Sequence, residues 1–586
     1  MPVKNKINWT KPQKEFIDES KKGKFVVSAC PGSGKTSTVS KKLALMIDKW
    51  KNNYKGIATI SFTNVASEEI KSNVENIYKI KIPFPHYIGT IDSFINKYIF
   101  LPYGHLIMKC QNRPILVGEP HGKWHAKYFY EDHFDKIIYN INGELINKTR
   151  LNLKQESKNK ILKRKKIINS TGFATQSDAN YFSMKILESY PNISKLICKR
   201  FPCFIIDEAQ DTSDIQMKIF DLLIKNNLKN IMFIGDPEQA IFEWNDAKPE
   251  KFKEKFYAWS ENSMQFKTNF RSSNDICKFA SKFSENHFIS KSDCYDFSIN
   301  ENIIISYSEN IQEIIKNFID LCKKYEITIS QENVAVLFRS KNFAKKFVDG
   351  IKFKDITINN IWKDEKDRNK ENFSKDFLKG KFLWDNENKI KGFKLIEKAV
   401  IKAENDLAYI EKEKMNKIIF EKGFSSHRKK IMKIIKLLPV ITPEKNVNKW
   451  VLETNDIFSE KNISYKINEI KNSTKHNFKK RLLFNDLFFD KEDSLSDEYY
   501  MGTVHSVKGK SFDAVLLILK SKAVNNVKYS TLLNKNIPLD NSEELRIIYV
   551  GITRPRKILQ IAVPKNDKKY WIDFFKNKQI SLDSFF

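Results

Sequence analysis

Residues 29–36, Ala-Cys-Pro-Gly-Ser-Gly-Lys-Thr, have the composition of a loop that binds nucleotide phosphates. The glycines leave backbone N–H groups free to face the β- and γ-phosphates, and Lys35 adds a fixed positive charge. Thr36 can place its hydroxyl on a bound Mg²⁺ ion. Such a loop alone is compatible with many classes of nucleotide-binding protein.

A second motif, Asp-Glu-Ala-Gln-Asp at 207–211, supplies the chemistry that the loop lacks. The apolar run 204–206 before it predicts a strand that delivers Asp207 to the metal ion and Glu208 to an attacking water. Both motifs follow strand-like runs, and they occur in this order along the chain. Together they predict hydrolysis of a nucleoside triphosphate.

Short β-rich runs recur along the chain and must position these motifs. They lie at 25–28, 57–60, 204–206, 231–234, 303–305, 334–337, 501–504 and 514–519. Helical patterns follow the early runs, which predicts a parallel α/β sheet with the phosphate loop at the carboxyl end of a strand. Thr10 and Pro12 are typical of a helix start and place Gln13 in the first turn of a helix.

The α/β pattern is interrupted twice, which predicts an α/β fold of two parallel-sheet cores, each with an inserted, mainly helical region. The expected parts are a first core at 1–95 and 196–264 with an insertion at 96–195, and a second core at 265–350 and 496–586 with an insertion at 351–495. A chain of 586 residues is too long for one hydrophobic core.

The net charge of +31 favours a polyanionic partner, because neutralising phosphates releases counterions. A biased base composition offers another explanation, since Lys, Asn and Ile are abundant throughout. The stretch 148–166 holds nine Lys or Arg against one Glu, and either a solvated helical face or a nucleic-acid-binding patch fits it.

The remaining composition indicates a soluble, cytoplasmic protein. No apolar run reaches about 18 residues, and the N-terminus lacks the apolar segment of a signal peptide. The seven cysteines lack the spacing of metal ligands, so we expect structural thiols and neither an iron–sulfur cluster nor a structural zinc site.

Further segments, in order along the chain, resemble the UvrD/Rep/PcrA group of superfamily 1 helicases. The matching segments are Gln13, 29–36, 60–64 (ISFTN), 89–94 (GTIDSF), 206–211, 235–244 (GDPEQAIFEW), 269–272 (NFRS), 334–340, 502–509 (GTVHSVKG) and 544–554. They cover both expected cores, whereas the two insertions match nothing specific. The resemblance implies two RecA-like P-loop NTPase cores that use ATP and Mg²⁺ to move 3′→5′ along single-stranded DNA and unwind it.

The resemblance also implies roles in an ATP site between the cores. Lys35, Thr36 and Asp207 would hold the phosphates and the metal ion, and Ala29, Pro31, Gly32, Ser33 and Gly34 would complete the loop. Glu208 would orient or deprotonate the water, Gln239 would sense the γ-phosphate, and Arg271 and Arg554 of the second core would act as arginine fingers. Gln13 would read the adenine edge, and Phe270 would stack on the ring, unless it is a core aromatic.

For DNA, the family stacks successive bases on aromatic side chains. The matching residues are Phe62, Phe242 and Trp244, with Asn64, Thr90, Thr503 and His505 as contacts to the backbone phosphates. A structural role is the alternative for His505. The expected partners are single-stranded DNA and its junctions with duplex, and no membrane.

Three positions depart from the family pattern. Ser37 and Ser511 replace residues that help to hold the nucleoside in relatives, which leaves nucleotide selectivity open. Asp92 replaces a usual His and is expected to place a negative charge near the DNA. The short second insertion resembles a compact, Gabija-like branch that works with an OLD-family nuclease in antiviral defence. The alternative function is therefore a DNA- or nucleotide-sensing NTPase component of such a complex, rather than a helicase of DNA repair.

Overall fold

The computed structural model of this chain describes most of both cores and most of the two insertions. It describes residues 8–18, 23–118, 121, 136–147, 155–241, 247–281, 283, 291–292, 303–307, 310–344, 368–386, 389–405, 410, 412–442, 444–469, 482–487, 498–519, 543–564, 568–569, 571 and 573. Two compact units hold these residues, 1–348 with 494–586 and 349–493.

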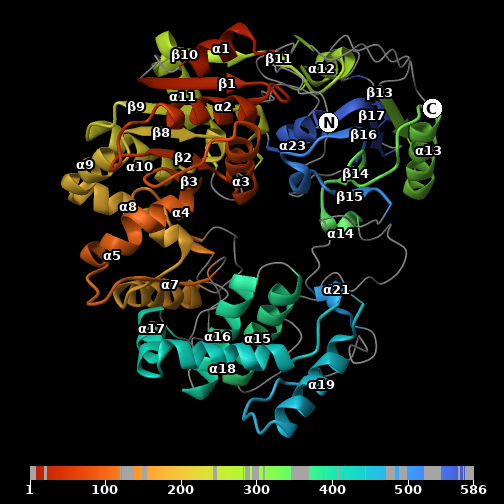
Figure 1. The fold of residues 1–586 in the computed structure, drawn as a ribbon. Coiled ribbons are helices and arrows are strands. Elements are labelled where there is room, and N and C mark those ends of the chain that lie inside the picture. The colour runs from red at the N-terminus through yellow and green to blue at the C-terminus, as the bar shows by residue number, and fades with distance from the viewer. Residues whose placement is uncertain are drawn as a thin grey trace. The chain divides into compact units, whose positions relative to one another are not determined.

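The first core is built on a six-stranded parallel sheet, as the recurring apolar runs predict (Figure 1). Its strands, in spatial order, are β10 (Ser263–Phe266), β1 (Lys24–Ala29), β9 (Asn230–Gly235), β8 (Cys203–Ile206), β2 (Ile57–Ser61) and β3 (Tyr87–Thr90). The strand β10 continues through Phe266, two residues beyond the boundary expected at 264.

Neighbouring residues of each strand point to opposite faces of this sheet, and helices bury both faces. Val26, Phe204 and Phe233 pack with one group of helices, whereas Val27, Ile205 and Ile234 pack with the other. The helices of this core are α1 (Lys11–Ile17), α2 (Lys35–Asp48), α3 (Asn64–Ser72), α10 (Asp214–Lys225) and α11 (Pro249–Ala258), with the short turns η1 (Asn73–Ile77), η3 (Ala209–Asp211), η4 (Pro237–Gln239) and η6 (Ser260–Asn262).

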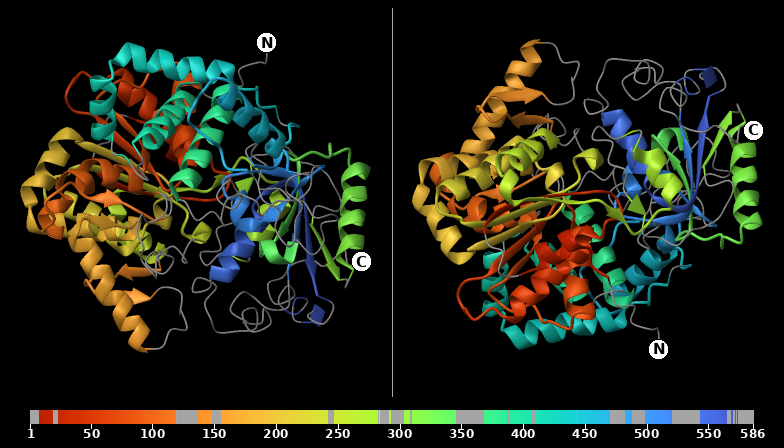
Figure 2. Two further views of the ribbon diagram at one scale, coloured as in Figure 1. Left: turned by 90° about the horizontal axis from the view of Figure 1, so that it is seen from below. Right: turned by 90° about the horizontal axis from the view of Figure 1, so that it is seen from above.

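The first insertion is mainly helical (Figures 1 and 2). Its elements are α4 (Ile91–Ile95), η2 (Asn96–Phe100), α5 (Leu101–Met108), β4 (Ile115–Leu116), β5 (Ile137–Tyr139), β6 (Leu145–Asn147), α7 (Gln155–Ser170), β7 (Phe173–Ala174), α8 (Gln176–Ser189) and α9 (Pro191–Arg200).

The basic stretch 148–166 reaches into α7, and its residues 148–154 lie outside the described part of the chain. Lys160, Lys163 and Lys166 are exposed on this helix. Lys165 is instead fully buried, and its ammonium group pairs with the buried carboxylate of Asp178 at 2.9 Å. Lys165 therefore fixes α7 to α8 and is not part of any nucleic-acid-binding patch.

The second core is a five-stranded parallel sheet covered by helices on both faces. Its strands, in spatial order, are β13 (Ile303–Tyr307), β17 (Pro555–Val563), β16 (Phe512–Ile518), β14 (Val334–Phe338) and β15 (Tyr500–Thr503). The remaining elements are β11 (Thr268–Asn269), α12 (Asn274–Ser281), β12 (Lys291–Ser292), α13 (Ile311–Lys324), α14 (Lys341–Ala344), η8 (Val504–Val507) and α23 (Glu543–Ile552). The predicted fold class, two α/β cores with parallel sheets, is confirmed.

The unit of residues 349–493 is helical wherever regular secondary structure is described. Its helices are α15 (Arg368–Asn386), α16 (Lys389–Glu404), α17 (Lys412–Glu421), α18 (Phe424–Leu437), α19 (Val447–Glu460) and α21 (Phe484–Leu487). Phe377, Ile431 and Trp450 of three different helices are buried in one cluster at its centre.

The last residue of α16, Glu404, joins several elements of this unit. Lys430 donates a hydrogen bond to its Oε1 at 2.8 Å, Tyr465 donates to the same atom at 2.6 Å, and Lys422 pairs with its Oε2 at 2.5 Å. Burial would raise the pKa of Glu404, but these three donors outweigh burial and lower the pKa to about 2.

We expect Glu404→Gln to destabilise this unit by about 1–3 kcal/mol at pH 7, because the ionised carboxylate is bound more tightly than a neutral amide. Since the pKa of Glu404 is depressed from 4.5 to about 2, its stabilisation is complete above pH 4.5 and is lost as the pH falls toward 2. Hydrogen exchange of peptides from α16 and α18 measures the change. The matched control is Glu421→Gln at an exposed site, and equal protection of both variants at pH 7 would contradict the prediction.

Within the described residues, no helix is both long enough and apolar enough to cross a membrane.

Candidate nucleotide-hydrolysis site

The phosphate loop connects the end of β1 to the start of α2. Gly32 and Gly34 have φ angles of 71° and 74°, in the left-handed region that favours glycine. Gly34 is the residue before α2, so Lys35 and Thr36 form the first turn of that helix. The N–H groups of a first turn have no partner within the helix and are suited to bind phosphate oxygens.

Gly32 is also required because the second core packs directly against it. The N–H of Phe270 donates a hydrogen bond to the Gly32 carbonyl at 2.9 Å. A Cβ atom on Gly32 would lie 2.5 Å from Oδ1 of Asn269 and 2.7 Å from Cβ of Arg271. A side chain at Gly32 would therefore push the segment that carries Arg271 away from the loop.

Asp207 follows β8 and is fully buried. Both oxygens of its carboxylate are buried, and no side chain that the structure describes donates a hydrogen bond to them. Burial, and then the neighbouring Glu208, raise the pKa of Asp207, whereas Lys35 and the backbone N–H of Glu208 oppose the shift. A buried carboxylate without a side-chain donor fits a divalent cation, so Asp207 and Thr36 are suited to hold Mg²⁺.

Glu208 has a φ of 53°, which is unusual for a residue with a side chain and is common at functional sites. Burial would raise the pKa of Glu208, but the charges of Lys35 and Lys508 lower it below its usual value. The Gln210 side chain donates a hydrogen bond to Oε2 of Glu208 at 2.6 Å. This carboxylate is therefore held ionised and oriented, as a group that positions a water must be.

Arg554 reaches from the second core to Gln239 of the first. The guanidinium of Arg554, which is 1% exposed, donates to Oε1 of Gln239 at 2.9 Å. Nε2 of Gln239 donates in turn to Asp236 at 2.6 Å. Burial, and then the nearby Arg271, lower the pKa of Arg554 to about 9, so it stays charged at neutral pH.

Arg271 lies beside Arg554 and donates to the carbonyl of Thr553 at 3.2 Å. Burial, followed by Arg556, lowers its pKa to about 10. The buried guanidinium of Arg554 and the half-buried one of Arg271 lie next to the phosphate loop. They form a site that is suited to a polyanion, because their mutual repulsion falls when phosphate binds between them.

Lys508 is a functional candidate that the sequence reasoning did not single out. Its ammonium group, on the second core, donates to Oδ2 of Asp211 at 2.6 Å and to the Gln239 carbonyl at 2.8 Å. Gln210 bridges Asp211 to Glu208, so this contact connects the second core to Glu208, the candidate catalytic base. The motif 502–509 includes Lys508, but residue type alone does not reveal a partner 297 positions away.

We expect Lys508→Met to lower kcat for ATP hydrolysis by about 10- to 100-fold, the range that corresponds to a hydrogen bond to a charged group of about 1.5–3 kcal/mol. Asp211→Asn should have a similar effect. The double variant should be no slower than either single variant, because both changes remove one interaction. Steady-state ATPase assays measure this cycle, with Lys557→Met as the control; effects that multiply in the double variant would contradict it.

The two residues predicted to contact the adenine of ATP lie beside the phosphate loop. Gln13 is 2% exposed, and its Nε2 donates to the Ser33 carbonyl at 2.9 Å and to Thr38 at 3.1 Å. Its Oε1 accepts from the N–H and hydroxyl of Thr10, so reading adenine requires the exchange of one of these bonds. Phe270 is 37% exposed and is thus not a core aromatic.

The predicted DNA contacts fall into two groups. Phe62 and Asn64 follow β2, and Thr90 is the last residue of the parallel strand β3, so all three lie at the same edge of the first sheet. Thr503 is the last residue of β15 in the second core, but it is only 8% exposed. Phe242 and Trp244 lie outside the described residues.

His505 lies against the first core, where it hydrogen-bonds the backbone of Ile241. Burial, and then the charge of Arg339, lower its pKa to about 4, so the imidazole is neutral at pH 7. A neutral imidazole that is bonded to the protein supports the structural alternative for His505.

The carboxylate of Asp92 is bound by side chains of two helices. Its Oδ1 accepts hydrogen bonds from Asn180 of α8 at 3.0 Å and from Gln216 of α10 at 2.9 Å. The carboxylate therefore joins the first insertion to the first core, and its expected position near the DNA stays a prediction.

Comparison with known proteins places both cores in one family of domains. The model of the UvrD/REP helicase N-terminal domain matches residues 9–257. The model of the UvrD-like helicase C-terminal domain matches residues 264–366 and 355–566, more than half of the chain.

Individual relatives match over shorter regions. The chain is 27% identical over 269 residues to Gabija protein GajB from Bacillus cereus (strain VD045), covering 45% of this chain and 47% of that protein. It is 36% identical over 116 residues to an ATP-dependent helicase/nuclease component from Streptococcus sanguinis (strain SK36), covering 19% of this chain and 9% of that protein. The matched regions thus span about half of the first relative and about a tenth of the second.

Proposed function

Since this chain belongs to the UvrD-like helicase family, we propose that it is an ATP-driven motor that moves 3′→5′ along single-stranded DNA and separates duplexes. The observation that carries the proposal is the contact between the cores: Arg554 and Lys508 of the second core reach Gln239 and Asp211 of the first. Hydrolysis at such a site depends on the approach of the two cores. We also propose that the protein acts in the cytoplasm.

The chain's own residues account for the steps of hydrolysis. The loop N–H groups and Lys35 bind the phosphates. Asp207 and Thr36 would hold Mg²⁺, which would supply positive charge against the phosphates. Glu208 orients the attacking water and accepts its proton. Arg554 and Arg271 stabilise the charge that spreads over the γ-phosphate oxygens in the transition state.

The same contacts convert hydrolysis into motion. Bound ATP attracts Arg271 and Arg554 and closes the cores, and loss of the γ-phosphate removes that attraction. DNA that is held by both cores is then moved when their spacing changes. The aromatic residues Phe62, Phe242 and Trp244 would stack on bases without reading their sequence, as a motor requires.

We expect Phe62→Ala to raise the concentration of single-stranded DNA that half-saturates ATPase stimulation by about 5- to 150-fold, because stacking on one base contributes about 1–3 kcal/mol. Phe84→Ala is the matched control. Phe84 is 79% exposed and precedes β3, so it lies at the edge of the sheet opposite Phe62, which follows the parallel strand β2. If the two variants needed the same DNA concentration for half-saturation, Phe62 would not be a DNA contact.

A second candidate is a DNA- or nucleotide-sensing NTPase component of an antiviral complex, with weak unwinding when alone. The match to Gabija protein GajB over 45% of this chain favours it. Co-purification with an OLD-family-like nuclease from the native host, together with ATPase activity that the nuclease alters, would support this role. Robust strand separation by the isolated chain would count against it.

A further inference from the structure

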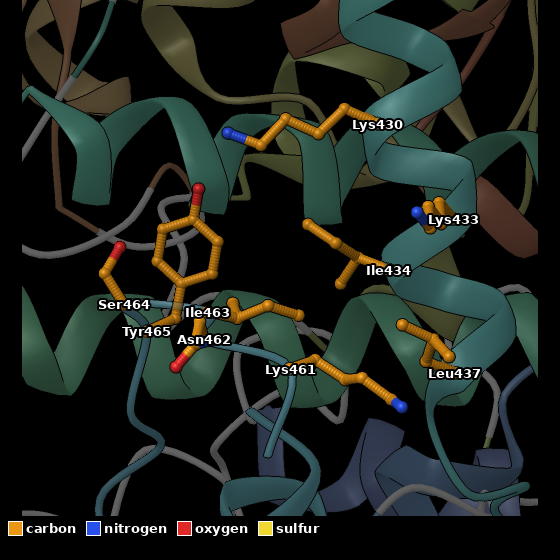
Figure 3. A pocket seen from close by; sticks show the side chains of 9 residues that line it. All are labelled: Lys430, Lys433, Ile434, Leu437, Lys461, Asn462, Ile463, Ser464 and Tyr465. Atoms are coloured by element: carbon orange, nitrogen blue, oxygen red, sulfur yellow. The ribbon is translucent and has the colours of Figure 1, made fainter. Parts of the chain in front are cut away.

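A pocket of about 490 Å³ lies within the unit of residues 349–493, between α18 and the segment that follows α19 (Figure 3). Three lysines line it, Lys430, Lys433 and Lys461, around an apolar surface formed by Ile434, Leu437 and Ile463. Cavities of this size are typical of small-molecule sites. The pocket shares no residue with the ATP site.

The arrangement follows from the sequence of α18. Positions 430, 433, 434 and 437 are three or four residues apart, so they share one face of the helix. Ile434 of this face is buried, whereas Lys430 and Lys433 are exposed at its border. The facing segment turns at Asn462, whose φ is 52°, and brings Ile463 and Tyr465 to the other side of the pocket.

The charge of the pocket is strongly positive. None of its lining residues is acidic, and α18 contains no Asp or Glu. The nearby carboxylate of Glu404 is already bound to Lys422, Lys430 and Tyr465. Lys433 and Lys461 form no ion pair with any residue in the described ranges.

The uncharged side chains that line the pocket are suited to contact a ring of a bound ligand. Figure 3 shows the side chain of Ile434 and the ring of Tyr465 pointing into the same space. The Tyr465 hydroxyl is fixed by its bond to Glu404, so the ring is held in place. Asn462 and Ser464 add hydrogen-bonding groups to the lining.

From this combination we propose that the pocket binds a nucleoside phosphate, with its base and sugar against Ile434, Leu437 and Tyr465 and its phosphates beside Lys433 and Lys461. A purely hydrophobic ligand would leave the lysines unpaired, and inorganic phosphate would leave the apolar surface uncovered. The ligand can be a free nucleotide or the 5′ end of a DNA strand, which present the same chemistry.

The test uses the full chain and photocrosslinking with 8-azido-ATP, followed by mass spectrometry of the labelled peptides. We expect two labelled regions, one at the phosphate loop and one within residues 424–437 or 461–469. Lys433→Glu/Lys461→Glu should lose at least nine-tenths of the second label and keep the first. Lys429→Glu/Lys436→Glu is the matched control, since both lysines are exposed on α18 but do not line the pocket; it should keep both labels.

Competition then distinguishes the two sources. Displacement of the second label by AMP but not by the 5′-phosphorylated dinucleotide pTpT identifies a free nucleotide, and displacement by pTpT identifies a strand end. Absence of the second label, or its equal loss in the control, would overturn the proposal. ATP turnover at saturating ATP should be unchanged in the Lys433→Glu/Lys461→Glu variant, so failure of this site and failure of the motor site are separable.

Discussion

Arg554→Ala is expected to lower kcat for ATP hydrolysis by about 10³- to 10⁵-fold, the effect of removing an arginine finger from a comparable hydrolase. Arg554 is buried and is bonded to Gln239 across the contact between the cores, so its charge lies beside the residue that we propose as the γ-phosphate sensor. Steady-state and single-turnover ATPase assays measure the loss. Nucleotide affinity should change much less, since the phosphate loop is intact.

Two further variants serve as comparisons for Arg554→Ala. Arg554→Lys keeps the charge but not the planar fork that bonds both Gln239 and phosphate, so it should restore only a small part of the rate. Arg113→Ala removes an arginine that donates to Leu101 in the first insertion and should leave kcat unchanged. A loss of less than tenfold in Arg554→Ala would remove Arg554 from the catalytic site.

Glu208→Gln should lower kcat by about 10²- to 10⁴-fold while ATP still binds, because an amide of the same shape cannot accept the proton of the water. Lys35 and Lys508 keep the pKa of Glu208 below its usual 4.5. Glu208 is therefore ionised above pH 4.5, so its titration should not change kcat between pH 6 and 8.

Rapid mixing that separates ATP binding from phosphate release measures the effect of Glu208→Gln. Glu250→Gln, at an exposed position on α11, is the control. A normal burst of phosphate release by Glu208→Gln would contradict the assignment. So would a fall of wild-type kcat below pH 7 that disappears in Glu208→Gln, because Glu208 itself would then titrate near neutrality.

Much of the fold follows from local sequence. Runs such as 204–206 and 231–234 are apolar throughout, as strands buried on both faces must be, and their predicted positions are confirmed. The strand β10 was not predicted, because Ser263–Phe266 alternates polar and apolar residues and lacks such a run. The helix start at Thr10 was predicted because capping depends only on neighbouring residues.

The sequence predicted which residues belong to the candidate site, but not which partners their side chains contact. Side chains that are committed to distant partners gave no local signal: Asp92 bonds to Asn180 and Gln216, and Lys165 pairs with Asp178. The same is true of Lys508, which reaches Asp211 only because the two sheets meet in the folded chain. Residue type predicts the chemistry of a group, whereas the three-dimensional fold decides which group it faces.

The central claim is that hydrolysis at the contact between the cores drives movement along DNA. The most direct test measures ATP hydrolysis by the purified chain with and without single-stranded DNA, alongside strand separation of duplexes with a 3′ or a 5′ single-stranded tail. We predict strong stimulation by single-stranded DNA and separation of the 3′-tailed duplex alone. ATP turnover that is indifferent to DNA, with both duplexes left intact, would contradict the account.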